Sequence, residues 1–268
     1  ILDPETAILS LPALGLEGDN LAAVQEALAR PYGMILVTGP TGSGKSTTLY
    51  AMLQTLNRER FNIVSLEDPI EYNIEGVNQS QVRPEIGYTF ANGLRSILRQ
   101  DPDIMLVGEI RDKETAELAI HSALTGHLVL TTLHTNNAIG AVTRLMDMGV
   151  EPFLLAPTLA CVIGQRLVQT LCADSRKPIK VEGVLKERLE SELTGIPTDA
   201  RKKISLPKEV YEALPSATCP KGTRGRIGAF EVLATSKEFE RVLLRAPTHE
   251  AIEAEFRRQR RLTLREDG

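Results

Sequence analysis

The sequence predicts an α/β fold in which helices cover a mainly parallel sheet. Two observations support this prediction. Short, almost uninterrupted apolar runs recur up to about Cys172, and longer segments with helical periodicity separate them. Strands that are buried on both faces need such continuous apolar runs. The 268 residues suffice for one large domain, or for a domain with a smaller appendage.

The expected elements follow from these patterns in chain order. Strands are predicted at Met34–Thr38, Ile63–Leu66, Ile104–Val107 and Leu128–Thr132. Apolar residues at helical spacing predict helices over Leu49–Leu56 and Phe90–Leu98. A third helix is expected over Asn136–Met148, with Gly149 as its C-cap.

The character of the chain changes after Cys172. Residues 173–222 are charged, poorly periodic and rich in proline, so we expect an inserted segment with short helices near Gly183–Leu193 and Pro207–Leu214. A strand then follows at Arg226–Leu233, with helices at Ser236–Leu244 and Thr248–Arg261. The predicted division is therefore an α/β domain over 1–172 and a smaller, mostly helical C-terminal subdomain over 173–268.

Composition excludes several classes of protein. The formal net charge of −4 argues against general nucleic-acid binding. The longest apolar stretch, Phe153–Gly164, contains Pro157 and is too short to span a bilayer. Acidic residues occupy the start of the chain, where a signal peptide would be basic, so a cytoplasmic location is expected. The two chain ends look like those of a fragment.

Residues 39–46, GPTGSGKS, match the phosphate-binding pattern G-x-x-x-x-G-K-[ST] between a predicted strand and a predicted helix. Glycines let successive backbone N–H groups point at a polyanion, and the helix N-terminus adds positive potential. The alternative is a glycine-rich turn before a core helix, but the complete match in this context favours a nucleoside triphosphate. The predicted nucleotide-binding residues are Gly39, Pro40, Thr41, Gly42, Ser43, Gly44, Lys45, Ser46 and Thr47.

Two carboxylates follow predicted strands. Glu109 ends the buried run that begins at Asp103, and Glu67 ends the run Ile63–Leu66. Because ligands of open α/β sheets bind at the carboxyl edge of the strands, both acids can face the same terminal phosphate. We expect them to share the metal and water roles, in an order that the spacing leaves open, with Ser46 and Glu109 holding Mg²⁺. The alternative for a strand-end acid is a helix N-cap or a solvated turn.

One histidine lies at each end of the predicted strand Leu128–Thr132. His134 follows it, at the nucleotide-facing edge, where an imidazole can donate to the terminal phosphate. We therefore include His134 among the catalytic candidates. His127 precedes the strand and is better explained as a hydrogen-bonded histidine at the far edge.

These segments resemble the type II secretion and type IV pilus assembly ATPases. The resemblance consists of four ordered blocks: GPTGSGKSTTLY at 39–50, EDPIEY at 67–72, TFANGLRSILRQDPDIMLVGEIRD at 89–112 and TGHLVLTTLHTN at 125–136. In that family the blocks are the Walker A, Asp box, Walker B and His box of a RecA-like P-loop core. The resemblance thus implies that Gly39–Thr47, Glu67, Glu109 and His134 face ATP or ADP.

The resemblance also implies a function. Such proteins are hexameric motors that hydrolyse ATP with Mg²⁺ at the cytoplasmic face of the inner membrane, where they act on a platform protein and build a pseudopilus or pilus. An N-terminal domain supplies arginines to the site, and few residues here precede the phosphate loop. Since an arginine finger contributes about 10³–10⁵ in rate, we expect weak hydrolysis from this chain alone. Alternatives are a pilus retraction motor, a conjugation-type translocation ATPase and a non-hydrolysing nucleotide-dependent scaffold.

The cysteines depart from the family pattern. Many assembly ATPases carry a zinc site of two C-x-x-C pairs, but Ser175 and Gly222 replace the second thiols after Cys172 and Cys219. Zinc is not expected because a structural site needs four N or S ligands. Three cysteines also do not suggest a disulfide framework, so we expect packing to hold the inserted segment together. Cys161 lies in an apolar, helix-like stretch and is predicted to be a core residue.

Overall fold

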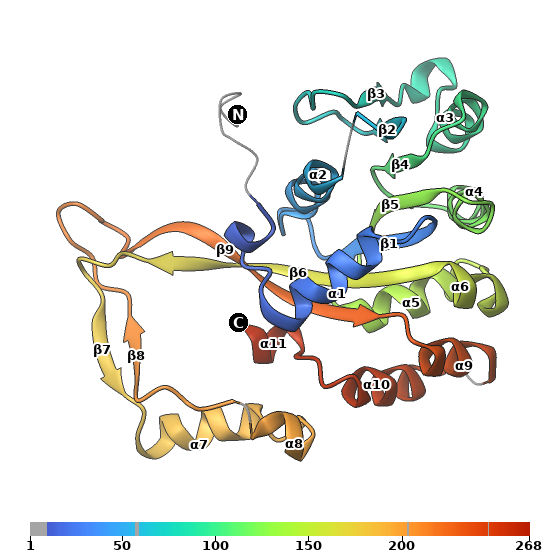
Figure 1. The fold of residues 1–268 in the computed structure, drawn as a ribbon. Helices are drawn as coiled ribbons and strands as arrows, with labels where there is room; N and C mark the ends of the chain where they lie inside the picture. Colours follow the sequence, from blue (N-terminus) through green and yellow to red (C-terminus); the bar gives the residue numbers. More distant parts are fainter. Residues whose placement is uncertain (1–9, 57–58, 203, 246) are drawn as a thin grey trace.

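The computed structural model describes residues 10–56, 59–202, 204–245 and 247–268. A seven-stranded sheet with the order β3-β2-β4-β5-β1-β6-β9 forms its centre, and helices lie on both faces of this sheet (Figure 1). Neighbouring strands run parallel except for the antiparallel pair β6–β9. The predicted α/β fold with a mostly parallel sheet is therefore confirmed.

The strands of the sheet follow the apolar runs of the sequence. They are β1 (Gly33–Thr38), β2 (Ile63–Glu67), β3 (Asn78–Gln81), β4 (Ile104–Val107), β5 (Leu128–Leu133), β6 (Leu159–Leu171) and β9 (Thr223–Ala234). Every residue of β1, β2, β4 and β5 is buried, as expected from their composition. The helix-like interpretation of the stretch around Cys161 is wrong. That residue is buried in β6, where the β-branched Val162 and Ile163 favour a strand.

The helices cover the sheet in two sets. On one face lie α1 (Gly18–Leu28) and α2 (Lys45–Thr55); on the other lie α3 (Phe90–Ile97), α4 (Lys113–Leu124), α5 (Ala138–Asp147), α6 (Pro152–Thr158), α9 (Lys237–Arg245) and α10 (His249–Arg258). Successive side chains of β1 point to opposite faces, so Met34 and Leu36 join one hydrophobic cluster while Ile35 and Val37 join the other. Each face of the sheet thus has its own core.

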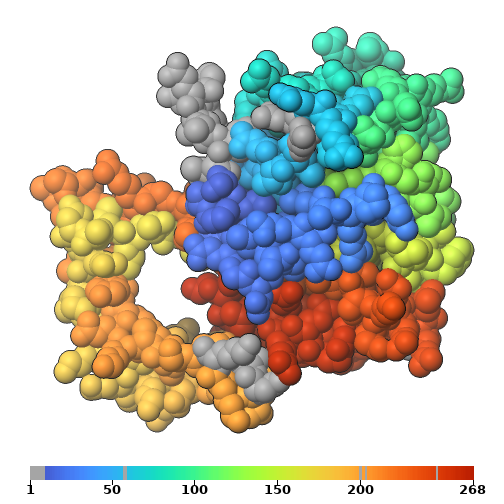
Figure 2. Space-filling model, viewed as in Figure 1, coloured from blue at the N-terminus to red at the C-terminus, as the bar shows by residue number. Residues whose placement is uncertain are grey.

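Residues 173–222 form a projection, which we call the arm. It contains β7 (Lys177–Lys180), α7 (Gly183–Glu192), α8 (Thr198–Arg201) and β8 (Glu209–Glu212). The helix expected near Gly183–Leu193 is confirmed. The helix expected over Pro207–Leu214 is wrong, because β8 pairs there with β7 in an antiparallel two-stranded sheet. Val210 and Tyr211, which favour strands, explain the difference. Figure 2 shows an opening between the arm and the rest of the molecule.

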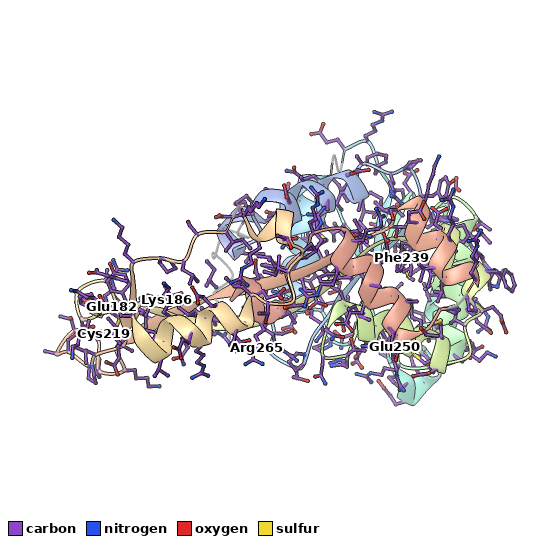
Figure 3. All side chains as sticks on the ribbon, turned by 90° about the horizontal axis from the view of Figure 1, so that it is seen from below. Glu182, Lys186, Cys219, Phe239, Glu250 and Arg265 are labelled. Atoms are coloured by element: carbon purple, nitrogen blue, oxygen red, sulfur yellow. A yellow bond between two sulfur atoms is a disulfide. The ribbon has the colours of Figure 1, made fainter. Side chains whose placement is uncertain are left out.

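A disulfide joins Cys172 to Cys219 at the base of the arm, across a sequence separation of 47 residues. The expectation that packing alone holds this segment is therefore wrong. Close to this disulfide, Cys172 N–H donates to Gly222 O at 3.0 Å, where the chain returns to β9. Figure 3 shows Cys219 in the arm, far from Phe239 in α9.

The residues that follow the arm rejoin the main sheet. Strand β9 pairs with β6 over most of its length, and the short helix α11 (Leu264–Asp267) then packs beside β9. The division of the chain into two domains at residue 172 stays a prediction. Residues 223–234, which follow that division, form β9 of the main sheet. No helix in the described part of the chain has the length and hydrophobicity needed to cross a membrane.

Candidate functional site

The phosphate loop connects the end of β1 to the start of α2, as the sequence predicts. Gly42 and Gly44 have φ values of 77° and 89°, a left-handed conformation that favours glycine. A Cβ at Gly39 would lie 2.5 Å from the carbonyl oxygen of Gln165 in β6. The loop therefore needs its glycines both for its curvature and for its close approach to the neighbouring strand.

The side chain of Lys45 lies inside this loop. Its Nζ donates to the carbonyl oxygens of Gly39 at 3.0 Å and Pro40 at 3.1 Å. Burial lowers the pKa of the Lys45 ammonium, and the carboxylate of Glu109 opposes that shift. A cation that is partly desolvated beside the N-terminus of α2 is suited to bind phosphate oxygens.

A cleft of about 440 Å³ lies over the loop and the carboxyl ends of β2 and β4. Of the predicted nucleotide-binding residues, the cleft is lined by Thr41, Gly42, Gly44, Lys45, Ser46 and Thr47. Gly39, Pro40 and Ser43 do not line it. The three predicted catalytic residues, Glu67, Glu109 and His134, also line this cleft. The structure thus brings the predicted residues from four blocks of sequence to one place.

Glu109 stands at the centre of an ionic cluster. Its carboxylate pairs with the guanidinium of Arg111 and lies 3.0 Å from Nε2 of His134. Burial by itself raises the pKa of Glu109, but Arg111 and His134 outweigh this effect and hold the pKa below its ordinary value. Arg111 also approaches Asp68 at 3.4 Å. Sequence reasoning missed Arg111, although its place two residues after the strand-end acid was a usable signal.

Glu67 has a different environment. Its residue is only 4% exposed, and its carboxylate accepts hydrogen bonds from Tyr50 Oη, from Ser65 Oγ at 2.5 Å and from Gln79 Nε2 at 3.1 Å. All three donors are neutral. Sequence reasoning did not identify Tyr50 or Gln79, because only the packing of α2 and β3 against β2 brings them to Glu67.

The other histidine of this strand lies where the sequence placed it. His127 precedes β5, and its Nδ1 lies 2.9 Å from the carbonyl oxygen of Ser122 at the end of α4. The expectation of a hydrogen-bonded histidine at the far edge of the sheet is confirmed.

The donor set fits a nucleotide with Mg²⁺. The phosphate loop offers backbone N–H groups, the Lys45 ammonium and the Ser46 hydroxyl. Glu109 lines the same cleft and offers a carboxylate. In the part of the chain that the structure describes, no group of three or more His, Cys, Asp or Glu residues could hold a metal by itself. Ser46 and Glu109 would supply protein ligands to Mg²⁺, which commonly binds through one or two protein ligands together with substrate phosphates and water.

Comparison with known proteins decides the family. A family model described as "Type II/IV secretion system protein" matches residues 1–268. The chain belongs to this family. It is 46% identical over 269 residues to the type II secretion system ATPase E of Vibrio cholerae, a match that covers 100% of this chain and 51% of that protein. It is 48% identical over 245 residues to the type IV pilus assembly ATPase PilB of Acinetobacter baylyi, covering 91% of this chain and 41% of that protein.

A solved structure agrees with this membership of the type II/IV secretion family. The pilus retraction motor PilT with bound ADP is 29% identical to this chain, with a TM-score of 0.64 over 99% of this chain and 67% of that one. The resemblance that the four sequence blocks predicted is therefore confirmed. The chain spans about half the length of the curated relatives it matches.

Proposed function

We propose that this chain is the catalytic part of a motor that hydrolyses ATP to drive assembly of a type II secretion pseudopilus or a type IV pilus. One observation carries the proposal: the phosphate loop, Glu109 and His134 meet in a single cleft. The relatives named as type II secretion ATPase E and PilB support it at 46% and 48% identity. The match to the retraction motor PilT, at 29%, favours retraction less.

The surroundings of the two carboxylates suggest different roles. Glu109 is paired with Arg111 and His134, which makes it a weak base and leaves it suited to orient water bound to Mg²⁺ beside Ser46. The donors to Glu67 among the described residues are neutral, so we assign Glu67 to accept the proton of the attacking water. His134 is placed to donate to the terminal phosphate, and Lys45 and the loop N–H groups bind the β- and γ-phosphates.

The setting of the whole protein is part of the same proposal. We infer a homo-hexamer at the cytoplasmic side of the inner membrane, acting on a membrane platform protein and not on nucleic acid. The relatives, named as components of secretion and pilus systems, support this inference. Because arginines from another domain would complete each site, this chain alone should hydrolyse ATP weakly.

Two substitutions test the function. Lys45→Ala should abolish the heat of Mg·ATP binding in calorimetry while leaving the protein folded, because it removes the loop's cation. Glu109→Gln should still bind ATP but release phosphate about 10² times more slowly, because it loses the carboxylate that orients water at the metal. The matched control is Glu117→Gln, since Glu117 is an exposed acid paired with Lys113 on α4.

The outcomes separate a motor from a scaffold. Equal phosphate release by the wild type and Glu109→Gln would remove Glu109 from catalysis. An intact protein that binds Mg·ATP but releases no phosphate would instead be a nucleotide-dependent scaffold. Absence of any binding heat in folded protein would contradict the nucleotide site itself.

A further inference from the structure

The environment of Glu67 contains a donor that the function above does not use. Tyr50 is 1% exposed and lies on α2, the helix that begins at Lys45 of the phosphate loop. Its hydroxyl donates to Oε2 of Glu67 in the neighbouring strand β2. The bond therefore joins the helix that carries the phosphate-binding lysine to the strand that carries the candidate base.

Tyr50 is held firmly enough to orient a partner. Its ring packs edge-to-face against Tyr72, with 4.6 Å between ring centroids and an interplanar angle of 88°. Its oxygen accepts from Glu71 N–H at 3.4 Å. Burial, and then the contact with Glu67, raise the pKa of the Tyr50 phenol, so it stays protonated and acts as the donor.

The other oxygen of Glu67 is also fixed. Oε1 accepts from Ser65 Oγ at 2.5 Å and from Gln79 Nε2 at 3.1 Å. The amide of Gln79 is oriented in turn, because its Oε1 accepts from Ile74 N–H at 2.7 Å and its Nε2 also donates to Tyr72 O at 3.2 Å. Neither carboxylate oxygen of Glu67 can rotate without breaking a hydrogen bond.

A carboxylate offers about four acceptor positions, and three are occupied here. Glu67 lines the cleft, so its fourth position is available to a water there. The side-chain donors to Glu67 among the described residues are Tyr50, Ser65 and Gln79, and all three are neutral. Of these, only Tyr50 comes from the phosphate-loop helix.

We propose that Tyr50 is a positioning residue that orients Glu67 for ATP hydrolysis. The inference rests on the proposed function. In the reaction, the water oxygen bonds to the γ-phosphorus, and the bond from that phosphorus to the bridging oxygen breaks. The water proton passes to Glu67, and ADP and phosphate are the products. Tyr50 also lines the cleft, but its hydroxyl is directed to Glu67 and takes no part in the bond changes.

The test is hydrolysis of Mg·ATP by the intact protein, with kcat and KM measured separately. Tyr50→Phe removes one donor to the Glu67 carboxylate and keeps the aromatic ring. The kcat should fall by about ten-fold, because the candidate base loses one of the hydrogen bonds that orient it. The KM for ATP should stay within about two-fold, since the variant keeps the ring that lines the cleft.

Two further variants keep the test decisive. Ser65→Ala removes a different donor to the same carboxylate without touching α2, so it should lower kcat and keep KM even where Tyr50→Phe fails to fold. The matched control is Tyr88→Phe, which also removes a tyrosine hydrogen bond, the half-buried one with Ser80 Oγ at 2.8 Å. Tyr88 does not line the cleft, and this variant should leave kcat unchanged.

The contrary outcomes are distinguishable. If Glu67→Gln abolishes hydrolysis while Tyr50→Phe and Ser65→Ala leave kcat unchanged, or change only KM, the inference about Tyr50 is overturned and the proposed function stands. If Glu67→Gln hydrolyses ATP at the wild-type rate, the role of Glu67 in the proposed function falls, and that of Tyr50 falls with it.

Discussion

The arm and the rest of the protein, which we call the body, are stabilised in different ways. The structure describes the body over residues 10–56, 59–172, 223–245 and 247–268, and the arm over residues 173–202 and 204–222. In the body, β1 and β5 are buried along their whole length between two hydrophobic clusters. In the described part of the arm, the buried apolar side chains besides the disulfide cysteines are Leu193 and Ile196. Hydrophobic burial thus stabilises the body, while the arm depends on a cross-link and a few peripheral contacts.

The arm closes back onto the body at its far end. Leu193 and Ile196 of the arm pack against Leu262, which follows α10. Glu192 of α7 pairs with Arg265 of α11. No described residue of the arm lines the nucleotide cleft. We therefore expect that the arm can loosen without disturbing the cleft, and that substitutions in one region leave the other unchanged.

The largest effect is expected from a truncation in the body. Phe239 of α9 is completely buried, so Phe239→Ala should lower the free energy of unfolding by about 3–5 kcal/mol through lost burial and a cavity. Phe153→Ala is the matched control, because Phe153 is 60% exposed and its loss should cost less than about 0.5 kcal/mol. Chemical denaturation measures both, and equal losses would contradict the assignment of Phe239 to the core.

The next effect concerns the arm alone. The variant with Cys172→Ser and Cys219→Ser opens a loop whose closure contributes about 4 kcal/mol in the chain-entropy model. Amide hydrogens of the arm should exchange faster, while ATP affinity and the protection of β1 and β5 stay unchanged.

Cys161→Ala is the opposite control for that experiment. Cys161 is the buried free thiol of β6, so its truncation should weaken the body and leave exchange in the arm as it was. Loss of ATP binding in the double variant would show that the arm and the cleft are coupled, which would contradict the independence of the two regions.

The same contrast explains what the sequence could predict. The strands β1, β2, β4 and β5 were predictable because burial on both faces demands continuous apolar runs. Strand β3 was not, since its residues Asn78–Gln81 are polar and it lies at the sheet edge. In the arm, where few side chains are buried, periodicity is a poor guide, and the strand Glu209–Glu212 was mistaken for part of a helix.

The site divides in a similar way. Lys45, Glu109 and His134 belong to linear motifs whose strands end at one edge, so their meeting could be predicted. Tyr50 could not be assigned, because its contact with Glu67 depends on how α2 packs against β2. The disulfide depends likewise on the path of a 47-residue segment that no local pattern specifies.

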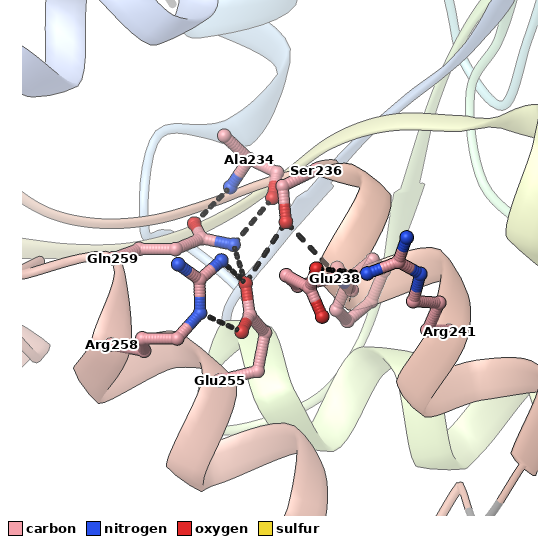
Figure 4. Close-up of polar contacts among 8 residues, drawn as sticks. Ala234, Ser236, Glu238, Arg241, Glu255, Arg258 and Gln259 are labelled. Carbon is pink, nitrogen blue, oxygen red and sulfur yellow. Dashed lines mark hydrogen bonds and ion pairs between the residues drawn. The ribbon is translucent and has the colours of Figure 1, made fainter.

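The smallest expected effect on the free energy of unfolding concerns arginine–glutamate pairs on α9 and α10. Figure 4 shows two arginine–glutamate pairs of the same i,i+3 spacing. The Glu255 side chain is 4% exposed, and it also accepts from Ser236 Oγ at 2.9 Å and Gln259 Nε2 at 3.1 Å. The Gln259 side chain accepts a hydrogen bond from Ala234 N–H and donates one to Ala234 O. These hydrogen bonds connect the end of α10 to the end of β9. The Glu238 side chain in the other pair is 48% exposed.

Arg258→Met should therefore cost about 1–2 kcal/mol of unfolding free energy near pH 7, and the matched Arg241→Met less than about 0.5 kcal/mol.

Burial raises the pKa of Glu255, but the hydrogen bonds from Arg258, Gln259 and Ser236 outweigh this effect and hold the pKa below 4.5. A lowered carboxyl pKa stabilises the fold above the unfolded value and loses that effect as pH falls through the folded value. The cost of Arg258→Met should consequently shrink below pH 4.5 in denaturation curves. A cost that is equal for both variants, or constant with pH, would mean that the Arg258–Glu255 pair does not hold α10 on the sheet.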